Sequence, residues 1–486
     1  MAPSGRHLNW SEITDFSPGL FTVSDWLIPA NGSQTMTNCV PSVGGGLRAF
    51  VKPTAVSTTG IVDITQEAVI GLFSSFHSVR VGIGNSYDRY LVTYNATDNK
   101  TRVYRMDGTN GETTWTIKKT TAASTGGVPP NPTLFDSFVD AAGNQHAVFN
   151  LLGATTSDGL WSIAWSTGTV TQRTAATQLG GPVAVQDDRI YAAYDHKLWF
   201  SDSQSFTFSA ANFLLVQASR LGGGIVSINA FAPSDILIGT VAGPWIMIQG
   251  DITDPIVRTM SDAHTPGAHQ KVVFTENGLA FIEPQTGVFL TSTGDQFTDI
   301  STQIDPNTWV STGVDVGYGD LAYAPNYLFA PNGLVYDFRV RSWFRLSNVG
   351  FHMTADKLNR TMLLATSGVN FSIFQYDTKE NASARYDTYT WKSAPFRSTD
   401  GRQIEIREVQ VICRTYDTAQ VAVTVNGTTR TVTGLTAGKH YVSFPFVERD
   451  DVLDVQVVPT AGATSVEAPS IEAVRIGQGS GHLLYS

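Results

Sequence analysis

Aspartate is the residue type in this sequence with the most evident capacity for chemistry, because paired carboxylates drive glycoside hydrolysis. Asp187-Asp188, Asp202, Asp295 and Asp305 could bring two carboxyl groups about 5–9 Å apart in a cleft, as that reaction requires. In chains built from short hairpins, however, aspartate is mostly a turn residue that bonds its own backbone. A sialidase would also need repeated Ser-x-Asp-x-Gly-x-x-Trp turns, and none occurs. We expect no enzyme and assign no catalytic residue, with a glycoside hydrolase as the least favoured alternative.

Other residue patterns point to no metal and no cofactor. His264 and His269 are the only close histidine pair, and the Pro-Gly between them predicts a loop, without the i,i+4 helical spacing of zinc proteases. Gly44–Gly46 and Gly222–Gly224 lack the Lys-Ser/Thr that follows in a phosphate-binding loop. Two cysteines, Cys39 and Cys413, lie far apart and are expected to be reduced thiols.

The elements that position these residues must be mostly strands. Charged residues make up 15% of the 486 residues and aromatic residues 11%, a composition of strands and turns around a large core. The net charge of −10 provides no global attraction to nucleic acid or anionic membrane. No apolar run is long enough to span a membrane or to act as a secretory signal, so we expect a protein that folds in the cytosol.

Short hairpins recur through the first four fifths of the chain. Strand pairs are predicted around Asp195-His196-Lys197, Glu276-Asn277-Gly278 and Pro331-Asn332-Gly333, because Asn-Gly tolerates the positive φ of tight turns. These aromatic-rich units recur at intervals of roughly 40–55 residues, which is typical of β-propeller blades. A meander of unrelated sheets or a large sandwich is the alternative.

The pattern changes after a predicted linker at 383–391. Apolar residues then alternate strictly, as in Ile404–Ile412, Gln420–Val425 and Ile471–Ile476, which predicts a β-sandwich. The predicted fold class is therefore all-β, an irregular β-propeller-like body with a C-terminal β-sandwich domain. Its predicted parts are an extended N-terminal assembly segment (1–55), the propeller-like domain (56–385) and the sandwich (386–486).

Several short motifs, in order, resemble a known family. Asp15-Phe16-Ser-Pro-Gly19 is followed by Asn38 and by Gly45-Gly46-Leu47-Arg48 with Lys52-Pro53, which looks like the opening of phage tail nozzle, or tail tubular protein B, proteins. Asp188–Tyr191 with Leu198–Ser201, and Asp235–Thr240 with Gly243–Ile246, resemble two blades of that family. The resemblance covers most of residues 10–350 as spaced motifs. The chain is short for a nozzle, so a nozzle and a minor tail-tip protein both remain open.

The resemblance implies a structural protein of the virion tail, assembled in the host cytoplasm. Such a propeller would form a homo-oligomeric ring, for example a hexamer, around the tail channel. Its partners would be other tail proteins, such as adaptor, fibre or tail-tip proteins, and DNA would pass through the lumen without specific binding. An acidic surface suits that passage, since binding phosphates needs Lys and Arg.

We expect the N-terminal segment to reach across a neighbouring subunit and to add strands to it. The candidate assembly contacts are Asp15, Phe16, Trp26, Asn38, Leu47 and Arg48. Deleting residues 1–50 should then leave a soluble monomer that cannot assemble. A receptor- or glycan-binding virion protein is the alternative function, with Trp391 as its candidate exposed aromatic at the periphery.

Overall fold

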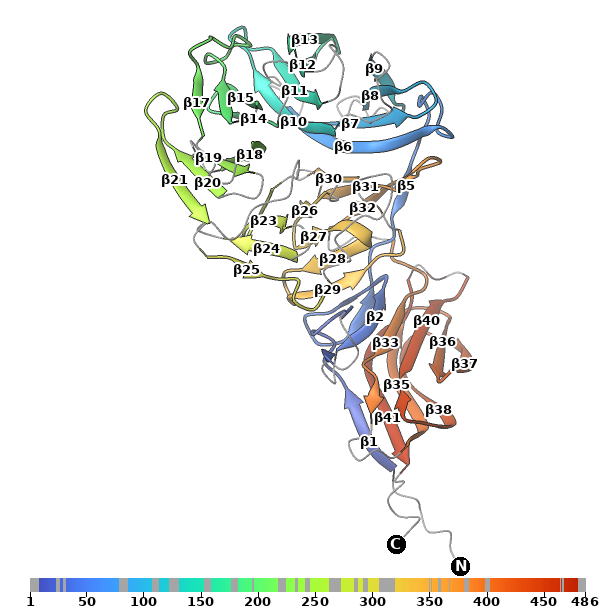
Figure 1. Cartoon of the computed structure of the whole chain (residues 1–486). Coiled ribbons are helices and arrows are strands. Elements are labelled where there is room, and N and C mark those ends of the chain that lie inside the picture. Colours follow the sequence, from blue (N-terminus) through green and yellow to red (C-terminus); the bar gives the residue numbers. More distant parts are fainter. Residues whose placement is uncertain are drawn as a thin grey trace, which may run out of the picture.

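The chain is built from strands joined by turns in the computed structural model (Figure 1). The structure describes residues 8–479 apart from 23–26, 29–31, 78–85, 107–112, 122–130, 153–158, 176–181, 195, 217–223, 232–234, 241–244, 262–271, 284–286, 292–295, 306–319, 349, 351, 357–359, 367, 380–383, 398–402, 464 and 466. Within these ranges no helix is long and apolar enough to cross a membrane.

In the described part of the chain, seven groups of four antiparallel strands follow one another around a ring and form the blades of a propeller (Figure 1). The blades, in chain order, are β6 (Glu67–His77), β7 (Ser86–Asn95), β8 (Lys100–Met106) and β9 (Thr116–Thr120); β10 (Asn131–Val139), β11 (Gln145–Leu152), β12 (Gly159–Ala164) and β13 (Val170–Ala175); β14 (Val183–Gln186), β15 (Arg189–Tyr194), β16 (Lys197–Phe200) and β17 (Phe213–Leu215); β18 (Ile225–Phe231), β19 (Asp235–Thr240), β20 (Trp245–Gln249) and β21 (Ile256–Ser261); β22 (Val273–Thr275), β23 (Gly278–Glu283), β24 (Gly287–Thr291) and β25 (Thr298–Asp299); β26 (Ala322–Ala324), β27 (Tyr327–Phe329), β28 (Leu334–Asp337) and β29 (Ser342–Arg345); and β30 (His352–Asp356), β31 (Thr361–Ala365), β32 (Ile373–Asp377) and β5 (Thr54–Val56).

The ring is closed by residues from both ends of the propeller sequence. Strand β5 is the outer strand of blade 7, where Val56 pairs with Ile373 and Ala55 with Phe374. At the inner strands, the Ser74 hydroxyl of β6 lies 2.8 Å from that of Thr354 in β30. Blade 7 therefore contains one strand from the N-terminal segment, and it lies directly against blade 1.

The pattern of apolar residues differs between the strands of the blades and those of the sandwich, because blade strands are buried on both faces and sandwich strands on one. In β12, the first five residues, Gly159 to Ile163, are all buried, since the neighbouring blades cover both faces of the sheet. In β36 (Ala419–Val425), residues Ala419, Val421, Val423 and Val425 are buried while the side chains between them are partly exposed. This alternation is the pattern of a sheet with one face on a core.

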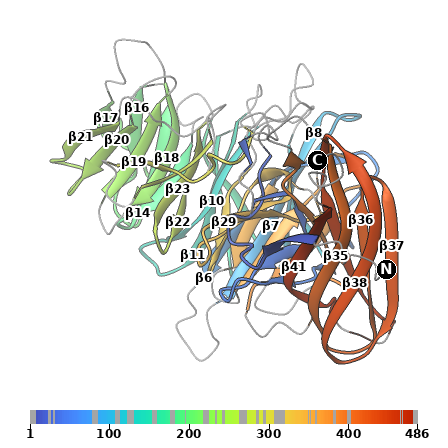
Figure 2. The same cartoon turned by 90° about the horizontal axis from the view of Figure 1, so that it is seen from below.

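A two-layer sandwich lies below the ring, and the N-terminal strands contribute to it (Figures 1 and 2). Its strands, with the N-terminal ones first, are β1 (Leu8–Ile13), β2 (Ser33–Thr37), β3 (Cys39–Pro41), β4 (Leu47–Ala49), β33 (Thr390–Ser393), β34 (Phe396–Arg397), β35 (Ile404–Thr415), β36, β37 (Thr428–Leu435), β38 (Gly438–Asp450), β39 (Val452–Leu453), β40 (Val455–Ala461) and β41 (Ser470–Gly479). One sheet has the order β3-β4-β41-β35-β38, with β1 also on β41. The other has the order β2-β33-β40-β36-β37 and continues through β2 into blade 6.

The predicted fold class is confirmed, including the hairpins at Asn277-Gly278 and Asn332-Gly333. The prediction for the N-terminal segment is wrong in one respect. Instead of reaching a neighbouring subunit, its described strands pair within their own chain, with β41 (β1 and β4), with β29 and β33 (β2) and with β32 (β5). The pairing partners lie more than 300 residues away in sequence, so no local pattern could indicate them.

Candidate functional site

The described aspartates considered for catalysis lie in turns and loops; Asp305 follows the turn after β25, and its backbone N–H donates to Thr22 Oγ1 at 2.7 Å. Asp187 and Asp188 have positive φ values of 47° and 57° and form the turn between β14 and β15. Asp188 accepts a hydrogen bond from Gln204, and Asp202 accepts one of 2.8 Å from Asn212. Asp295 lies outside the described residues. These carboxylates fix hairpins, which is the expected role of aspartate in turns.

Buried carboxylates form a second group, and each has its own partners. Glu67 is fully buried, accepts hydrogen bonds from Thr93 (2.7 Å) and Tyr104 (2.9 Å), and lies 3.1 Å from the Arg102 guanidinium. Asp88, also buried, lies 2.6 Å from Arg105 Nε. Such pairing is what permits a charge inside a protein. These groups hold the strands of blade 1 together.

Asp136 is the described carboxylate whose environment most resembles that of a catalytic acid. Burial raises its pKa above the ordinary aspartate value, as in many general acids. Both oxygens are nevertheless occupied, because one accepts the backbone N–H of Ser137 (2.8 Å) and the other that of Val185 (2.9 Å). Since Val185 belongs to β14, Asp136 joins blade 2 to blade 3.

No metal centre is found in the part of the chain that the structure describes: it contains no group of three or more His, Cys, Asp or Glu side chains that could hold an ion. His264 and His269 lie outside the described residues.

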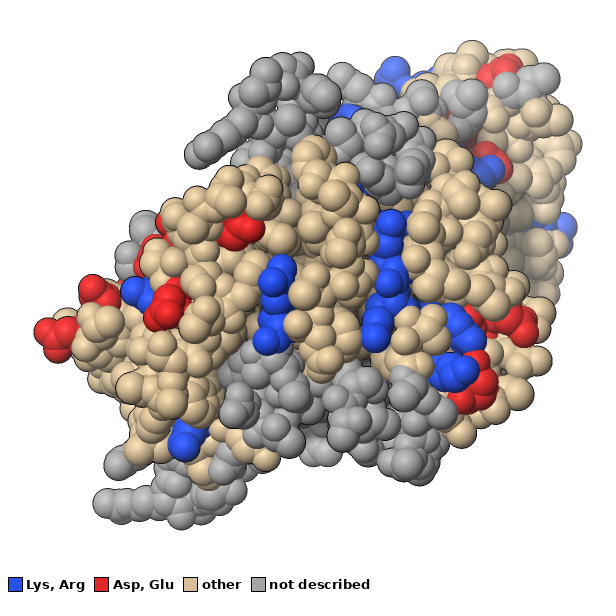
Figure 3. Space-filling model, turned by 90° about the horizontal axis from the view of Figure 1, so that it is seen from above, with Lys and Arg blue, Asp and Glu red and all other residues tan. Residues whose placement is uncertain are grey.

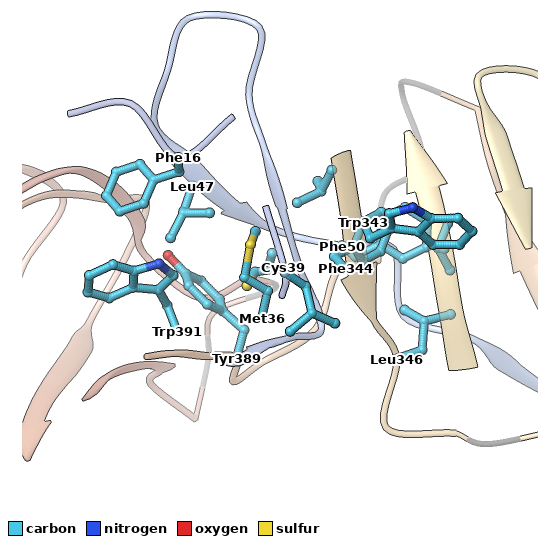
Figure 4. Packing of buried hydrophobic residues seen from close by; sticks show 14 of the residues in the cluster. Phe16, Met36, Cys39, Leu47, Phe50, Trp343, Phe344, Leu346, Tyr389 and Trp391 are labelled. Atoms are coloured by element: carbon cyan, nitrogen blue, oxygen red, sulfur yellow. The ribbon is translucent and has the colours of Figure 1, made fainter. Parts of the chain in front are cut away.

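The candidate assembly contacts are divided between core and surface. Phe16 and Leu47 are buried in the chain's own hydrophobic core, so as subunit contacts they are wrong (Figure 4). Asn38 adopts a positive φ of 61° between β2 and β3, and its side chain accepts the backbone N–H of Ser347, which attaches this turn to the end of blade 6. Asp15 is exposed and caps the backbone of Ser17, while Arg48 is half-buried. Trp26 lies outside the described residues.

Trp391, the candidate peripheral binding residue, is wrong as an exposed aromatic. It is fully buried, its ring nitrogen donates to Ser33 Oγ at 2.8 Å, and its ring meets Phe16 edge-on at a centroid distance of 5.3 Å. Figure 4 shows it in the same cluster as Met36, Leu47 and Tyr389. An N-terminal segment that packs against the sandwich covers this face, so the tryptophan is a core residue.

The two cysteines are buried and free. Both belong to the same hydrophobic core cluster as Tyr389, and Cys39 Sγ lies 3.6 Å from the backbone carbonyl oxygen of Thr390, the residue after that tyrosine. Burial raises the pKa of the Cys413 thiol to about 11 and that of Cys39 further. Thiols that stay protonated at neutral pH are poor nucleophiles, so a structural role follows.

A pocket of about 470 Å³ opens where the N-terminal segment meets the sandwich. Its lining mixes apolar side chains with one ion pair, Lys392 to Asp454 at 2.9 Å; the lining residues are Phe21, Thr22, Ile28, Gln34, Thr35, Lys392, Pro395, Val452 and Asp454. It has no nucleophile with an adjacent base, and nothing else in it indicates chemistry.

Free strand edges with apolar side chains are the feature that sequence reasoning missed. β17 and β21 are the outer strands of blades 3 and 4, and they expose Leu215 (64%), Ile256 (68%) and Val257 (59%). On the sandwich, β37 and β38 end their sheets, and β38 exposes Tyr441 and Val447. Consecutive apolar residues after Pro255 were an available signal, because a strand with one buried face would alternate.

No protein-family model and no curated protein matches the chain. Among solved structures it is similar to YCF48 from Cyanidioschyzon merolae (11% identity, 67% of this chain and 100% of that chain, TM-score 0.41). It is also similar to the β-propeller domain of Cps50 (Swd1) from Myceliophteria thermophila (9%, 60% and 94%, TM-score 0.37). A third is an exo-β-1,3-galactanase from Phanerochaete chrysosporium with galactose (10%, 87% and 100%, TM-score 0.27). These likenesses carry no functional argument, and the propeller rests on the strand order described above.

Proposed function

We propose that this chain is a structural component of a bacteriophage tail, a nozzle or tail-tip protein that assembles as a homo-oligomeric ring around the DNA channel. One observation carries the proposal. Free strand edges with exposed apolar side chains lie on opposite sides of the molecule, β17 and β21 on one side and β37 and β38 on the other (Figures 1 and 2). A ring of identical subunits needs two different complementary surfaces of this kind.

Unpaired edge strands also need an explanation in a soluble protein. A long exposed edge with apolar side chains pairs readily with other chains, and proteins normally block it with charge, proline or a covering segment. β21 exposes Ile256 and Val257 side by side, and β38 has 13 residues. Contact with the next subunit would cover both edges at once.

The motifs that resemble the nozzle family fall at equivalent places in successive blades. Asp188–Tyr191 spans the first turn of blade 3, and Asp235–Thr240 is the whole of strand β19 in blade 4. The Gly-Gly-Leu-Arg motif leads through β4 toward β5, which completes blade 7. These positions support the resemblance, which depends on the shared order of the motifs. Trp391, the residue on which the glycan-binding alternative depended, is buried and cannot contact a glycan at the surface.

Negative-stain imaging of the purified full chain, alone and with its tail neighbours, tests the proposal. We expect closed rings with a central opening, stacked on the neighbouring tail protein. Mass photometry of the same sample should give one discrete multiple of 52.5 kDa. A protein that stays monomeric at micromolar concentration in the presence of every neighbour would overturn the proposal.

A further inference from the structure

The rim of the propeller that is furthest from the sandwich is formed by blades 1 to 3, at the top of Figure 1. Figure 3 looks down on it and shows Lys and Arg side chains in columns that run between tan surfaces, with Asp and Glu toward the two ends of the face. The whole chain has a net charge of −10. The positive charge gathered on this rim is therefore opposite in sign to the net charge of the whole chain.

Two of the rim's cations lie where blade 1 meets blade 2. Lys119 of β9 places its ammonium 4.1 Å from the centre of the Trp161 ring of β12. Its neighbour Lys118 reaches the Gly168 turn, where a Cβ added to the glycine would lie 2.6 Å from Lys118 Nζ and 3.5 Å from Arg105 Nη1. Lys118 and Arg105 thus lie around the same turn, and like charges this close are unfavourable unless anions offset them.

Carboxylates neutralise only part of this charge. Arg105 is paired with the buried Asp88. Among the ion pairs between described residues, none involves Lys118 or Lys119. A cation held over an aromatic ring keeps its full charge. Within the part of the chain that the structure describes, no carboxylate therefore neutralises these two lysines of β9.

A third cation continues the rim where blade 2 meets blade 3. The Arg173 guanidinium of β13 lies 3.7 Å from the centre of the Phe206 ring, and its Nε donates to Ser162 Oγ at 2.8 Å. Asp140 is the carboxylate that acts on it electrostatically. Ring and hydroxyl fix the plane of the guanidinium, an arrangement suited to a phosphate partner.

We propose that this rim binds the phosphodiester backbone of duplex DNA, weakly and without sequence preference. Two features favour a polymer over a small anion: the cations lie at two neighbouring blade junctions, and they are held on separate strands, β9 and β13, instead of converging on one point. Contacts from Lys and Arg to phosphates carry charge but no sequence information. This inference deepens the proposed function and rests on it in one respect: the duplex is the DNA that the proposed ring would surround. A basic rim corrects the expectation from the sequence that the surface meeting this DNA is acidic.

Fluorescence anisotropy of the full chain with a labelled 30-base-pair duplex tests the proposal. We expect binding at about 50 mM salt that weakens steeply by about 200 mM. The double variant Lys118→Gln/Lys119→Gln should weaken binding at least roughly tenfold and lower the salt slope by roughly 1.8, since each lost phosphate contact removes about 0.9. Adding Arg173→Gln should weaken binding further.

The matched control is Arg430→Gln/Lys439→Gln, which removes the same charge from exposed positions on the sandwich. It should bind DNA as the wild type does, and circular dichroism should show that all variants are folded. Equal affinity and salt slope in Lys118→Gln/Lys119→Gln and the wild type would overturn the proposal. Competition by inorganic phosphate as strong as by unlabelled duplex, at matched ionic strength, would also overturn it.

Mass photometry of the same samples separates this inference from the proposed function. Rings without DNA affinity would overturn the rim proposal and leave the ring intact. DNA affinity that depends on Lys118 and Lys119 in a protein that never forms rings would support the rim proposal and contradict the ring.

Discussion

Trp391 lies where strand β2 of the N-terminal segment pairs with strand β33 of the sandwich. Replacing it with alanine removes the contact with Phe16 and leaves a large cavity, so we expect a loss of about 3–5 kcal/mol in the free energy of unfolding. Ser33→Ala removes only the acceptor of its ring N–H and should cost about 1–3 kcal/mol. Urea denaturation measures both. Trp10→Ala, at an exposed tryptophan, is the control and should change the free energy of unfolding little. A similarly small change in Trp391→Ala would contradict the place of Trp391 in the core.

Cys39 and Cys413 should be unreactive in the native protein, because both thiols are buried and their pKa values are raised by burial. We expect Ellman's reagent to label neither cysteine at pH 8 in buffer and to label both in denaturant. A cysteine introduced at the exposed Thr431 should react immediately and serves as the positive control. Rapid labelling of the native wild type would show that the core around Tyr389 is open.

Glu405 gives an acid-dependent contribution to stability. Hydrogen bonds from Arg407 at 3.0 Å lower the pKa of Glu405, and the charges of Arg407 and Arg449 lower it further. A carboxylate whose pKa is lowered on folding stabilises the protein above its unfolded pKa, and this contribution is lost as the pH falls through the folded pKa. The wild type should therefore be more stable than Glu405→Gln at pH 7, and the gap should narrow below about pH 4.5. Thermal melts from pH 7 to about pH 3 check this, and a constant gap would contradict it.

The strands of the N-terminal segment each complete a different part of the chain: β1 and β4 lie on β41, β2 connects blade 6 to the sandwich, and β5 completes blade 7. Deleting residues 1–50 should therefore expose the core instead of leaving the soluble monomer expected from the sequence. We expect an insoluble product, or one without near-ultraviolet circular dichroism. A soluble truncated chain with an unchanged cooperative melt would show that these pairings are dispensable.

A point substitution within the same segment tests the same idea without truncation. Phe16→Ala removes a fully buried ring and should cost about 3–5 kcal/mol, while Val43→Ala, at a side chain that is 78% exposed, should cost less than about 0.5 kcal/mol. Comparable small effects at both positions would indicate that the segment is only loosely attached.

A head-to-tail ring makes a distinctive prediction for the intact molecule. Ile256→Asp/Val257→Asp should block one interface surface, and Tyr441→Asp/Val447→Asp the other, because a desolvated carboxylate opposes burial of an apolar edge. Each variant alone should be a folded monomer by sedimentation velocity. An equimolar mixture should form dimers and nothing larger, since one good surface remains on each partner.

Val62→Asp is the control, at an exposed valine in the segment that precedes β6, and it should form rings like the wild type. If Ile256→Asp/Val257→Asp and Tyr441→Asp/Val447→Asp both still form rings, other surfaces make the contact between subunits. Monomers in the mixture would contradict the pairing of these two edges with each other.

Local sequence patterns determined the strands, the hairpins and the class of the fold. Asn277-Gly278 and Asn332-Gly333 predicted turns because their backbone conformation is a local property, and Val421 and Val423 marked a buried face by their spacing. Only the tertiary structure decided which strands share a sheet. Thr37 pairs with Thr390, and Val56 with Ile373, across more than 300 residues, and backbone hydrogen bonds between strands carry no signal in side-chain type. For the same reason the sequence could not show that Phe16 and Trp391 are buried together, nor that Lys118, Lys119 and Arg173 lie on one rim.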